Sequence, residues 1–168
     1  MQVLEVDGLT FEFPKSWVVS KCDEWSFYRK QFSKMWNGIK SLDILAIGPG
    51  KEVWLIEVKD YRLNVRTKPS HLHIEIAEKV FDTLALILPC RLNSNNLKER
   101  EVSHFILGAQ KLRVALHLEQ PRKSSKLRPR AINPADVQQK LRKMLKPIDA
   151  HPLVVEISKS HGMPWSVK

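Results

Sequence analysis

Residues 41–61, SLDILAIGPGKEVWLIEVKDY, are the stretch that most constrains the fold of this 168-residue chain. Two segments within it, roughly 42–47 and 53–59, are rich in Ile, Leu and Val, which is typical of buried strands. The Gly-Pro-Gly sequence at 48–50 lies between them and favours a hairpin loop. The sequence therefore predicts two adjacent antiparallel strands at the centre of the molecule.

Charged residues gather at one end of this predicted hairpin. A loop symmetric about Gly50 places Asp43 opposite Glu57 on the two strands. Lys59 points to the same face as Glu57 because side chains alternate along a strand. Opposed like charges destabilise a sheet, so the repulsion between the two carboxylates must be offset. A hard cation held by carboxylate oxygens is the usual means, and the pattern predicts a cation site.

Asp43 followed by Glu57-Val58-Lys59 resembles the core motif of the PD-(D/E)XK nuclease superfamily. Leu42 replaces the proline that often precedes the first Asp. The resemblance implies Mg²⁺ or Mn²⁺ bound by Asp43, Glu57 and the backbone carbonyl of Val58. It also implies hydrolysis of a phosphodiester bond by a metal-activated water. Lys59 would orient or deprotonate that water, or neutralise charge in the transition state.

The motif and the strand pattern together predict an α/β fold. We expect a central mixed β-sheet flanked by helices, with the restriction-endonuclease-like αβββαβ core that the resemblance implies. Residues 2–13 alternate in hydropathy around Asp7-Gly8 and predict an N-terminal hairpin. A helix that begins at Pro134 adds a basic C-terminal element. We expect one domain, with its core over about 14–120 and a basic extension over about 121–168.

The 28 Lys and Arg residues outnumber the 18 Asp and Glu residues, which gives a net charge of +10. This excess favours a polyanionic partner, most simply nucleic acid, over a merely basic protein without one. We expect DNA, although the sequence distinguishes neither DNA from RNA nor single strands from duplexes. We also consider a homodimer, since cutting both strands of a duplex usually needs two active sites.

The basic residues are concentrated in segment 121–147, which has nine Lys or Arg residues and one acidic residue. Its helix has an apolar stripe at Val137, Leu141, Met144 and Leu145, so it can pack on the sheet, bind nucleic acid, or do both. Residues 26–36 interleave basic and aromatic side chains, which suits either strand binding or a core flanked by solvated charges. The candidate nucleic-acid contacts are Arg29, Lys30, Arg62, Lys140, Arg142, Lys143 and Lys146.

Four residues outside the motif are further candidates for the site. Asp23 and Glu24 end a helix expected over 14–22, and the resemblance implies that an acid there joins the metal site. The alternative is a solvated acidic turn. His71 and His73, two residues apart in a polar loop, are either metal ligands or, as we favour, surface residues.

Residues 74–88 predict the clearest helix. Its expected apolar face contains Ile74, Ala77, Phe81, Leu84 and Leu88. Glu75 and Lys79 lie on the other face at i, i+4 spacing, where they favour a surface salt bridge. The resemblance gives Lys79 an alternative role, because the helix after the second strand often contributes a polar residue to the active site.

Four other segments have strand patterns. Residues 26–32 read as a strand, with a helix as the alternative, and residues 103–107 as a second strand. Residues 111–119 alternate clearly and predict a strand with one buried face and one partly wet face. Residues 153–157 predict a last short strand.

Cys22 and Cys90 lack the spacing of a metal site, so we expect a reducing, cytoplasmic setting. The N-terminus does not read as a signal peptide, and the longest apolar run, 84–88, is too short to cross a membrane. Three functions remain: an active nuclease, which we favour, an inactive nucleic-acid-binding module of the same fold, and an ordinary α/β interaction protein. The complete Asp, Glu and Lys set argues against the second. Buried acids need partners, which argues against the third.

Overall fold

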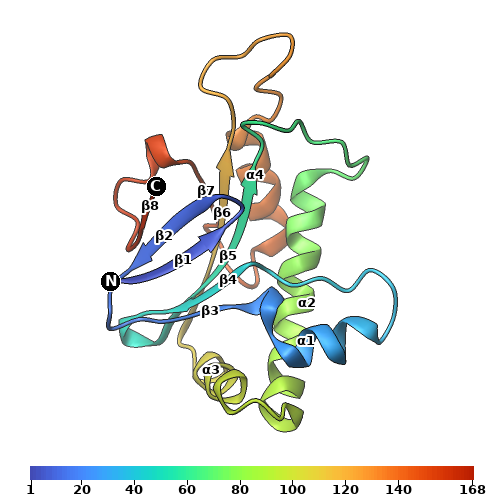
Figure 1. The fold of residues 1–168 in the computed structure, drawn as a ribbon, viewed down its shortest axis with the longest axis vertical. Coiled ribbons are helices and arrows are strands. Elements are labelled where there is room, and N and C mark those ends of the chain that lie inside the picture. The colour runs from blue at the N-terminus through green and yellow to red at the C-terminus, as the bar shows by residue number, and fades with distance from the viewer.

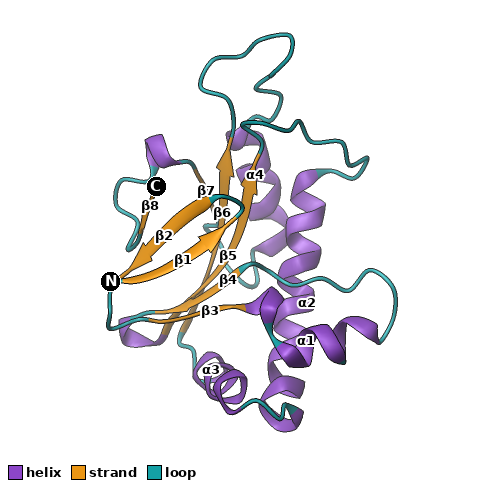
Figure 2. Cartoon of the chain, viewed as in Figure 1, coloured by secondary structure: helices purple, strands orange, loops and turns teal.

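A five-stranded mixed sheet forms the centre of the computed structural model, which describes residues 1–168 (Figures 1 and 2). Its strands, in spatial order, are β3 (Val18–Lys21), β4 (Ile44–Ile47), β5 (Glu52–Asp60), β6 (Lys111–Glu119) and β7 (Leu153–Val155). Neighbouring strands from β3 to β5 are antiparallel, and β6 and β7 are parallel to β5. The α/β class with a central mixed sheet is therefore confirmed.

Helices cover one face of this sheet. They are α1 (Ser26–Lys30), α2 (Leu72–Asn93), α3 (Leu97–Leu107) and α4 (Pro134–Leu145). Single 3₁₀ turns are formed by η1 (Cys22–Glu24), η2 (Phe32–Lys34), η3 (Pro49–Lys51) and η4 (Ile157–Lys159). The long α2 connects β5 to β6 together with α3, and α4 packs against α2 (Figure 1). No helix has both the length and the apolar character needed to cross a membrane.

A second, three-stranded sheet covers the other face. It contains β1 (Gln2–Val6), β2 (Leu9–Phe13) and β8 (Ser166–Val167), in the order β1-β2-β8. The expected N-terminal hairpin is thus confirmed, and Asp7 and Gly8 in its turn have positive φ angles of 49° and 76°, as a tight hairpin turn requires. An aromatic layer fills the space between the sheets and includes Phe11, Phe13, Trp54 and Trp165.

Two local assignments from the sequence are wrong: a segment expected to be helical contains a strand, and the next segment, expected to be a strand, is a helix. Residues 18–21 are a strand, because Val18 and Val19 pair with the end of β4, and no helix forms over 14–22. Residues 26–30 are the helix α1. The strands β3, β4 and β5, the helical crossover and β6 follow the expected order, but the first short helix follows β3 instead of preceding it.

Two further corrections concern long-range packing. Residues 103–107 end α3, whose first turn is capped by the Asn96 side chain, so they are not a strand. The second face of β6 is buried from Ala115 to Glu119, since His117 and Glu119 lie under the second sheet and η4, and Arg113 near the start of the strand is partly exposed. Neither covering element is adjacent in the sequence, so the local pattern could not reveal it.

The buried face of α2 also differs from the expected one. Ile76, Val80 and Ile87 are buried, whereas Phe81 and Leu88 are 47% and 53% exposed. Both sides of the helix carry apolar residues, so periodicity alone did not decide which side faces the core. The observed rotation turns Glu75 and Lys79 inward.

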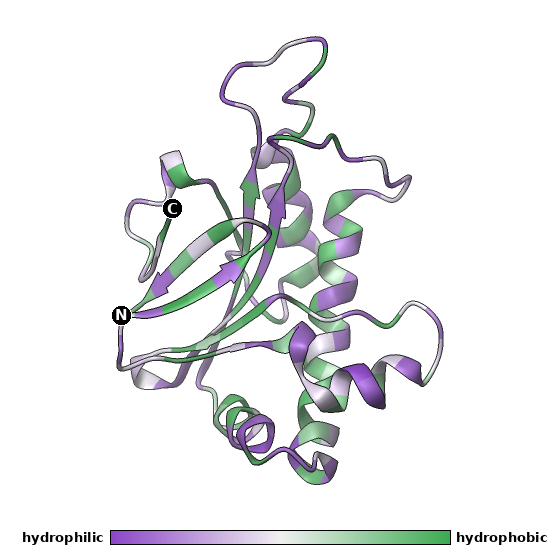
Figure 3. Cartoon of the chain, viewed as in Figure 1, coloured by the Kyte–Doolittle hydropathy of each residue, from purple (hydrophilic) through white to green (hydrophobic).

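The two longest loops leave from one end of the molecule, where β5 and β6 end (Figure 1). They are residues 61–71 after β5 and residues 120–133 after β6. Figure 3 shows that hydrophilic residues predominate in these loops, while the strands beneath them are largely hydrophobic. Ligands of α/β proteins bind outside the carboxyl ends of parallel strands, so this end is where a site is expected.

Gly48 at the β4–β5 turn packs against Trp17, and a Cβ atom there would lie 2.6 Å from the Trp17 ring. We predict that Gly48→Ala lowers the free energy of unfolding by about 1–3 kcal/mol, because the ring must move. Urea unfolding measures this loss. Gly108→Ala is the control, since its Cβ would meet no atom closer than 3.5 Å. Equal stability of the two variants would contradict the packing described here.

Candidate active site

The predicted hairpin register is confirmed, and it brings Asp43 to Glu57. Leu45 pairs with Leu55, and Ile44 pairs with Ile56. Asp43 immediately precedes β4, and its Oδ2 accepts a hydrogen bond from the backbone N–H of Val58 at 2.7 Å. The Asp43 carboxylate is therefore fixed beside the end of β5 that carries Glu57 and Lys59.

The chain before β4 is held from two sides. Two α2 side chains accept hydrogen bonds from it: Asp82 from the Lys40 N–H and Thr83 from the Leu42 N–H, both at 2.9 Å. On the other side, the Asp43 carbonyl accepts a bond from the Cys22 N–H at 3.2 Å. These contacts position Asp43 without involving its carboxylate.

Two ammonium groups neutralise the carboxylates. Lys79 Nζ, from α2, lies 2.5 Å from Glu57 Oε1 and 3.8 Å from Asp43 Oδ1. Because both oxygens contact the same ammonium group, the two carboxylates are neighbours, as a shared cation would require. Lys59 Nζ lies 2.7 Å from the same Glu57 oxygen. The like-charge repulsion that the sequence assigned to a metal is therefore already offset by lysines, and the expected surface pair of Lys79 with Glu75 is wrong.

Glu57 is fully buried, and its environment changes its acidity. Burial, and next the charge of Asp43, raise the pKa of Glu57 to about 7, although Lys79 and Lys59 oppose the shift. Its Oε2 has no hydrogen-bond partner. A buried carboxylate oxygen without a partner is costly, and it is an oxygen donor of the kind that Mg²⁺ and Mn²⁺ prefer.

Glu75, which the sequence placed in solvent, is buried and binds three cations. Arg66 and Lys68 lie 2.8 and 3.0 Å from its carboxylate, and Lys59 lies 3.5 Å away. Burial alone would raise the pKa of Glu75, but these cations outweigh it and lower the pKa to about 2. Glu75 thereby connects loop 61–71 to α2 and to Lys59.

Lys59 stays charged in this arrangement. Burial disfavours its ammonium form, but Glu57, Asp43 and Glu75 outweigh burial and raise the pKa of Lys59 above its ordinary value. In the metal-free protein, this protonated side chain suits two of the roles that the resemblance implied for Lys59, orienting a water and stabilising negative charge.

The structure distinguishes between the two acids that precede α1. Asp23 lies near Asp43: burial and the Asp43 charge raise its pKa, and its buried Oδ1 has no hydrogen-bond partner. Glu24 instead pairs with Lys21 at 2.5 Å and is half exposed. Asp23 is therefore the acid that lies toward Asp43, and Glu24 forms the solvated turn.

Other sequence candidates lie apart from the carboxylates or contribute no metal group. His71 and His73 stack on one another at the start of α2, with ring centroids 5.4 Å apart. The structure contains no group of three or more His, Cys, Asp or Glu residues arranged to hold a metal ion. A cation at Asp43 and Glu57 would thus depend on two carboxylates, backbone oxygen and water. The role of the Val58 carbonyl stays a prediction.

The candidate nucleic-acid contacts come from three separate elements. Arg29 and Lys30 end α1, and Arg62 forms a bidentate pair with Asp60 directly after β5. The α4 residues Arg142, Lys143 and Lys146 are exposed, while Lys140 pairs with Asp136 at 2.8 Å. The apolar stripe of α4 packs inward as expected except for Met144, which is 38% exposed. The helix is thus both packed and basic on its outer side.

Comparison with known proteins gives little direct information on this site. No family model matches the chain, and no solved structure matches it. A cysteine–tRNA ligase of Neisseria meningitidis serogroup A is 29% identical over 208 aligned residues, which cover 99% of this chain. The chain spans only 30% of the length of that relative.

The Glu75 cluster makes a pH-dependent contribution to stability. The folded pKa lies below the ordinary value of 4.5, so the stabilisation is present above about pH 4.5 and is lost as the pH falls toward 2. We predict that Glu75→Gln lowers the free energy of unfolding at pH 7 by about 1–2 kcal/mol, allowing for screening of the more exposed Lys68. Urea unfolding should show a smaller loss at pH 3.

The matched control is Glu78→Gln on the exposed side of the same helix, where Glu78 makes only a 3.7 Å contact with Lys40. It should change stability little at either pH. A loss for Glu75→Gln that is the same at pH 3 and pH 7 would show that packing, and not ionisation, is responsible.

Proposed function

We propose that this protein is a divalent-cation-dependent nuclease of the PD-(D/E)XK superfamily that hydrolyses phosphodiester bonds in nucleic acid. The observation that carries the proposal is the convergence of Asp43 and Glu57 from two neighbouring antiparallel strands, with Lys59 beside Glu57. The order of acid, acid and lysine is that of the superfamily motif.

The chain's own residues suit this chemistry. Asp43 and Glu57, with the Val58 carbonyl, would hold Mg²⁺ or Mn²⁺, and the partnerless oxygen of Glu57 fits a hard cation. The ion would polarise the phosphate and make a bound water more acidic. Lys59, held charged by Glu57 and Glu75, is placed to stabilise the negative charge that develops on the phosphate.

Nucleic acid is the partner that the net charge of +10 favours, and DNA remains our first expectation. RNA belongs beside it in any assay, because the similar protein from Neisseria is named for tRNA. Cys22 and Cys90 are both free, which agrees with a reducing cytoplasm. A homodimer would provide two active sites for cutting a duplex.

One observation favours the alternative, an inactive binding module of the same fold. Lys79 lies between the two carboxylates, where its ammonium group neutralises both. If Lys79 is a permanent substitute for a metal ion, the protein binds nucleic acid without cutting it. Titration with Mn²⁺ separates the two functions, because the alternative predicts no site.

We predict that Asp43→Asn and Glu57→Gln each abolish cleavage, since each removes a charged ligand of one cation. Single- and double-stranded DNA and RNA, each incubated with Mg²⁺ or Mn²⁺, form the assay. Lys59→Met should retain the Mn²⁺-induced rise in melting temperature and lose most of the rate. Glu78→Gln is the matched control and should cut normally. Cleavage by Glu57→Gln at the wild-type rate would refute the proposal.

Lys79 gives a separate prediction. Its ammonium group competes with a divalent cation for both carboxylates, so Lys79→Met should bind Mn²⁺ more tightly. The expected decrease in the dissociation constant is about tenfold or more, which corresponds to removing one favourable charge-assisted interaction. Calorimetric titration measures the change. Weaker Mn²⁺ binding by this variant would mean that Lys79 organises the carboxylates for the ion instead of competing with it.

A further inference from the structure

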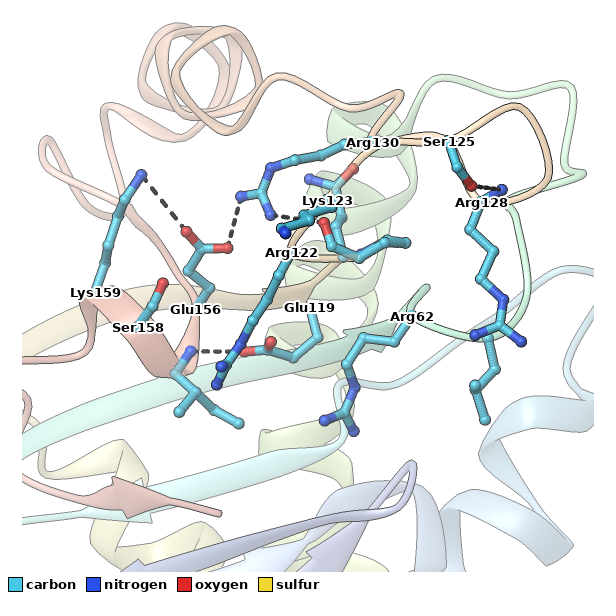
Figure 4. Close-up of a pocket in the computed structure, with 14 residues that line it drawn as sticks. Arg62, Glu119, Arg122, Lys123, Ser125, Arg128, Arg130, Glu156, Ser158 and Lys159 are labelled. Atoms are coloured by element: carbon cyan, nitrogen blue, oxygen red, sulfur yellow. Dashed lines mark hydrogen bonds and ion pairs between the residues drawn. The ribbon is translucent and has the colours of Figure 1, made fainter.

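A second polar site lies at the carboxyl ends of β5 and β6. It is a pocket of about 850 Å³ between the strand ends, residues 120–130 and η4 (Figure 4). Neither Asp43 nor Glu57 lines it. Two acidic residues, Glu119 and Glu156, contribute to its wall. Its cationic residues are Arg62, Arg122, Lys123, Arg128, Arg130 and Lys159.

Half of these cations are already paired. Arg62 binds Asp60, and both Arg130 and Lys159 contact Glu156, at 2.7 and 3.5 Å. The other acid, Glu119, accepts a hydrogen bond from the Ile157 N–H at 2.6 Å and lies 3.0 Å from His117. The side chains of Arg122, Lys123 and Arg128 make no hydrogen bond or ion pair. The pocket therefore retains three unneutralised cations.

The loop that carries these three cations is held by its own hydrogen bonds. The buried Gln120 side chain closes its base, donating to the Ile132 carbonyl at 2.9 Å and accepting from the Ile132 N–H at 3.0 Å. Nearer the tip, the Ser124 and Ser125 hydroxyls accept bonds from the Arg130 and Arg128 N–H groups. Such a loop presents its cations at limited entropic cost.

We propose that this pocket binds backbone phosphates of a nucleic-acid strand and does not read its bases. Arginine guanidinium groups match phosphate oxygens in a bidentate way, and the three free cations supply the charge. No aromatic residue lines the pocket, so it offers no surface on which a base would stack. The contact would thus position the strand without specifying its sequence.

The inference rests on the proposed nuclease function and extends it to the substrate. Arg62 follows Lys59 by three residues, so their Cα atoms are at most about 11 Å apart. One wall of the pocket, at Arg62, therefore lies near the backbone of Lys59. A strand that follows this wall around the end of β5 would approach the carboxylates from the opposite face of the sheet. The pocket would hold phosphates to one side of the bond that is cut.

The test is binding of a short fluorescent single-stranded oligonucleotide in EDTA, followed by anisotropy over a series of salt concentrations. The pocket variant combines Arg122→Gln, Lys123→Gln and Arg128→Gln. The matched control removes the same charge from α4 with Arg142→Gln, Lys143→Gln and Lys146→Gln. Removing three phosphate-binding cations from the pocket should reduce the slope of log K against log salt by about 2 and weaken binding at least about tenfold. The control should weaken binding less.

Two results would overturn the inference. If the α4 variant loses as much binding affinity as the pocket variant, or more, the strand lies on α4. The melting temperatures of both variants show whether each is folded. If inorganic pyrophosphate displaces the oligonucleotide at a concentration similar to that of the oligonucleotide itself, the pocket is a site for small anions and not for a strand. Because EDTA removes divalent ions, binding is measured independently of cleavage. If the pocket variant binds more weakly but the wild-type protein cuts no nucleic acid, only the proposed function is refuted. If the wild-type protein cuts nucleic acid but the pocket variant binds normally, only this inference is refuted.

Discussion

The pairing of Glu57 with Lys59 and Lys79 is the interaction on which the rest of the site depends. A fully buried carboxylate is costly unless it is paired, and here one ammonium comes from its own strand and the other from α2. Lys59 in turn contacts Glu75, which holds Arg66 and Lys68 of the following loop. One network of charges, with the buried Glu57 and Glu75 at its centre, therefore joins the sheet, the helix and the loop.

Two polar sites lie at this end of the sheet, and the alternation of side chains along β5 and β6 puts them on opposite faces. Glu57 and Lys59 point toward α2. Val58 lies between them on β5 and faces the second sheet, as does His117, the residue of β6 that pairs with Val58. The carboxylates consequently lie on the helical side of β5. Glu119, which points as His117 does, forms part of the cationic pocket. The last residues of two parallel strands thus serve both sites, with different chemistry on opposite faces.

The sequence was sufficient where a feature depends on local patterns. The β4–β5 register follows from the turn length, β6 from strict alternation, and the start of α4 from Pro134. The orientation of α2 was not predictable, because both of its sides are apolar and Glu75 and Lys79 gain their partners only on folding. For the same reason, the sequence could not tell which of Asp23 and Glu24 lies toward Asp43 and which is solvated. The pairing of β8 with β2 depends on contacts between residues that are distant in the chain, so local patterns did not reveal it. The loop after β6 depends on single hydrogen bonds such as that of Gln120 with Ile132, which have no sequence pattern.

A crystal structure with Mn²⁺ would show whether Asp43 and Glu57 form one cation site. We expect a single anomalous peak about 2.1 Å from an oxygen of each carboxylate, with Lys79 Nζ withdrawn from its present place beside Glu57. If no peak is found under saturating Mn²⁺ and Lys79 still lies between Asp43 and Glu57, the two carboxylates do not form a cation site.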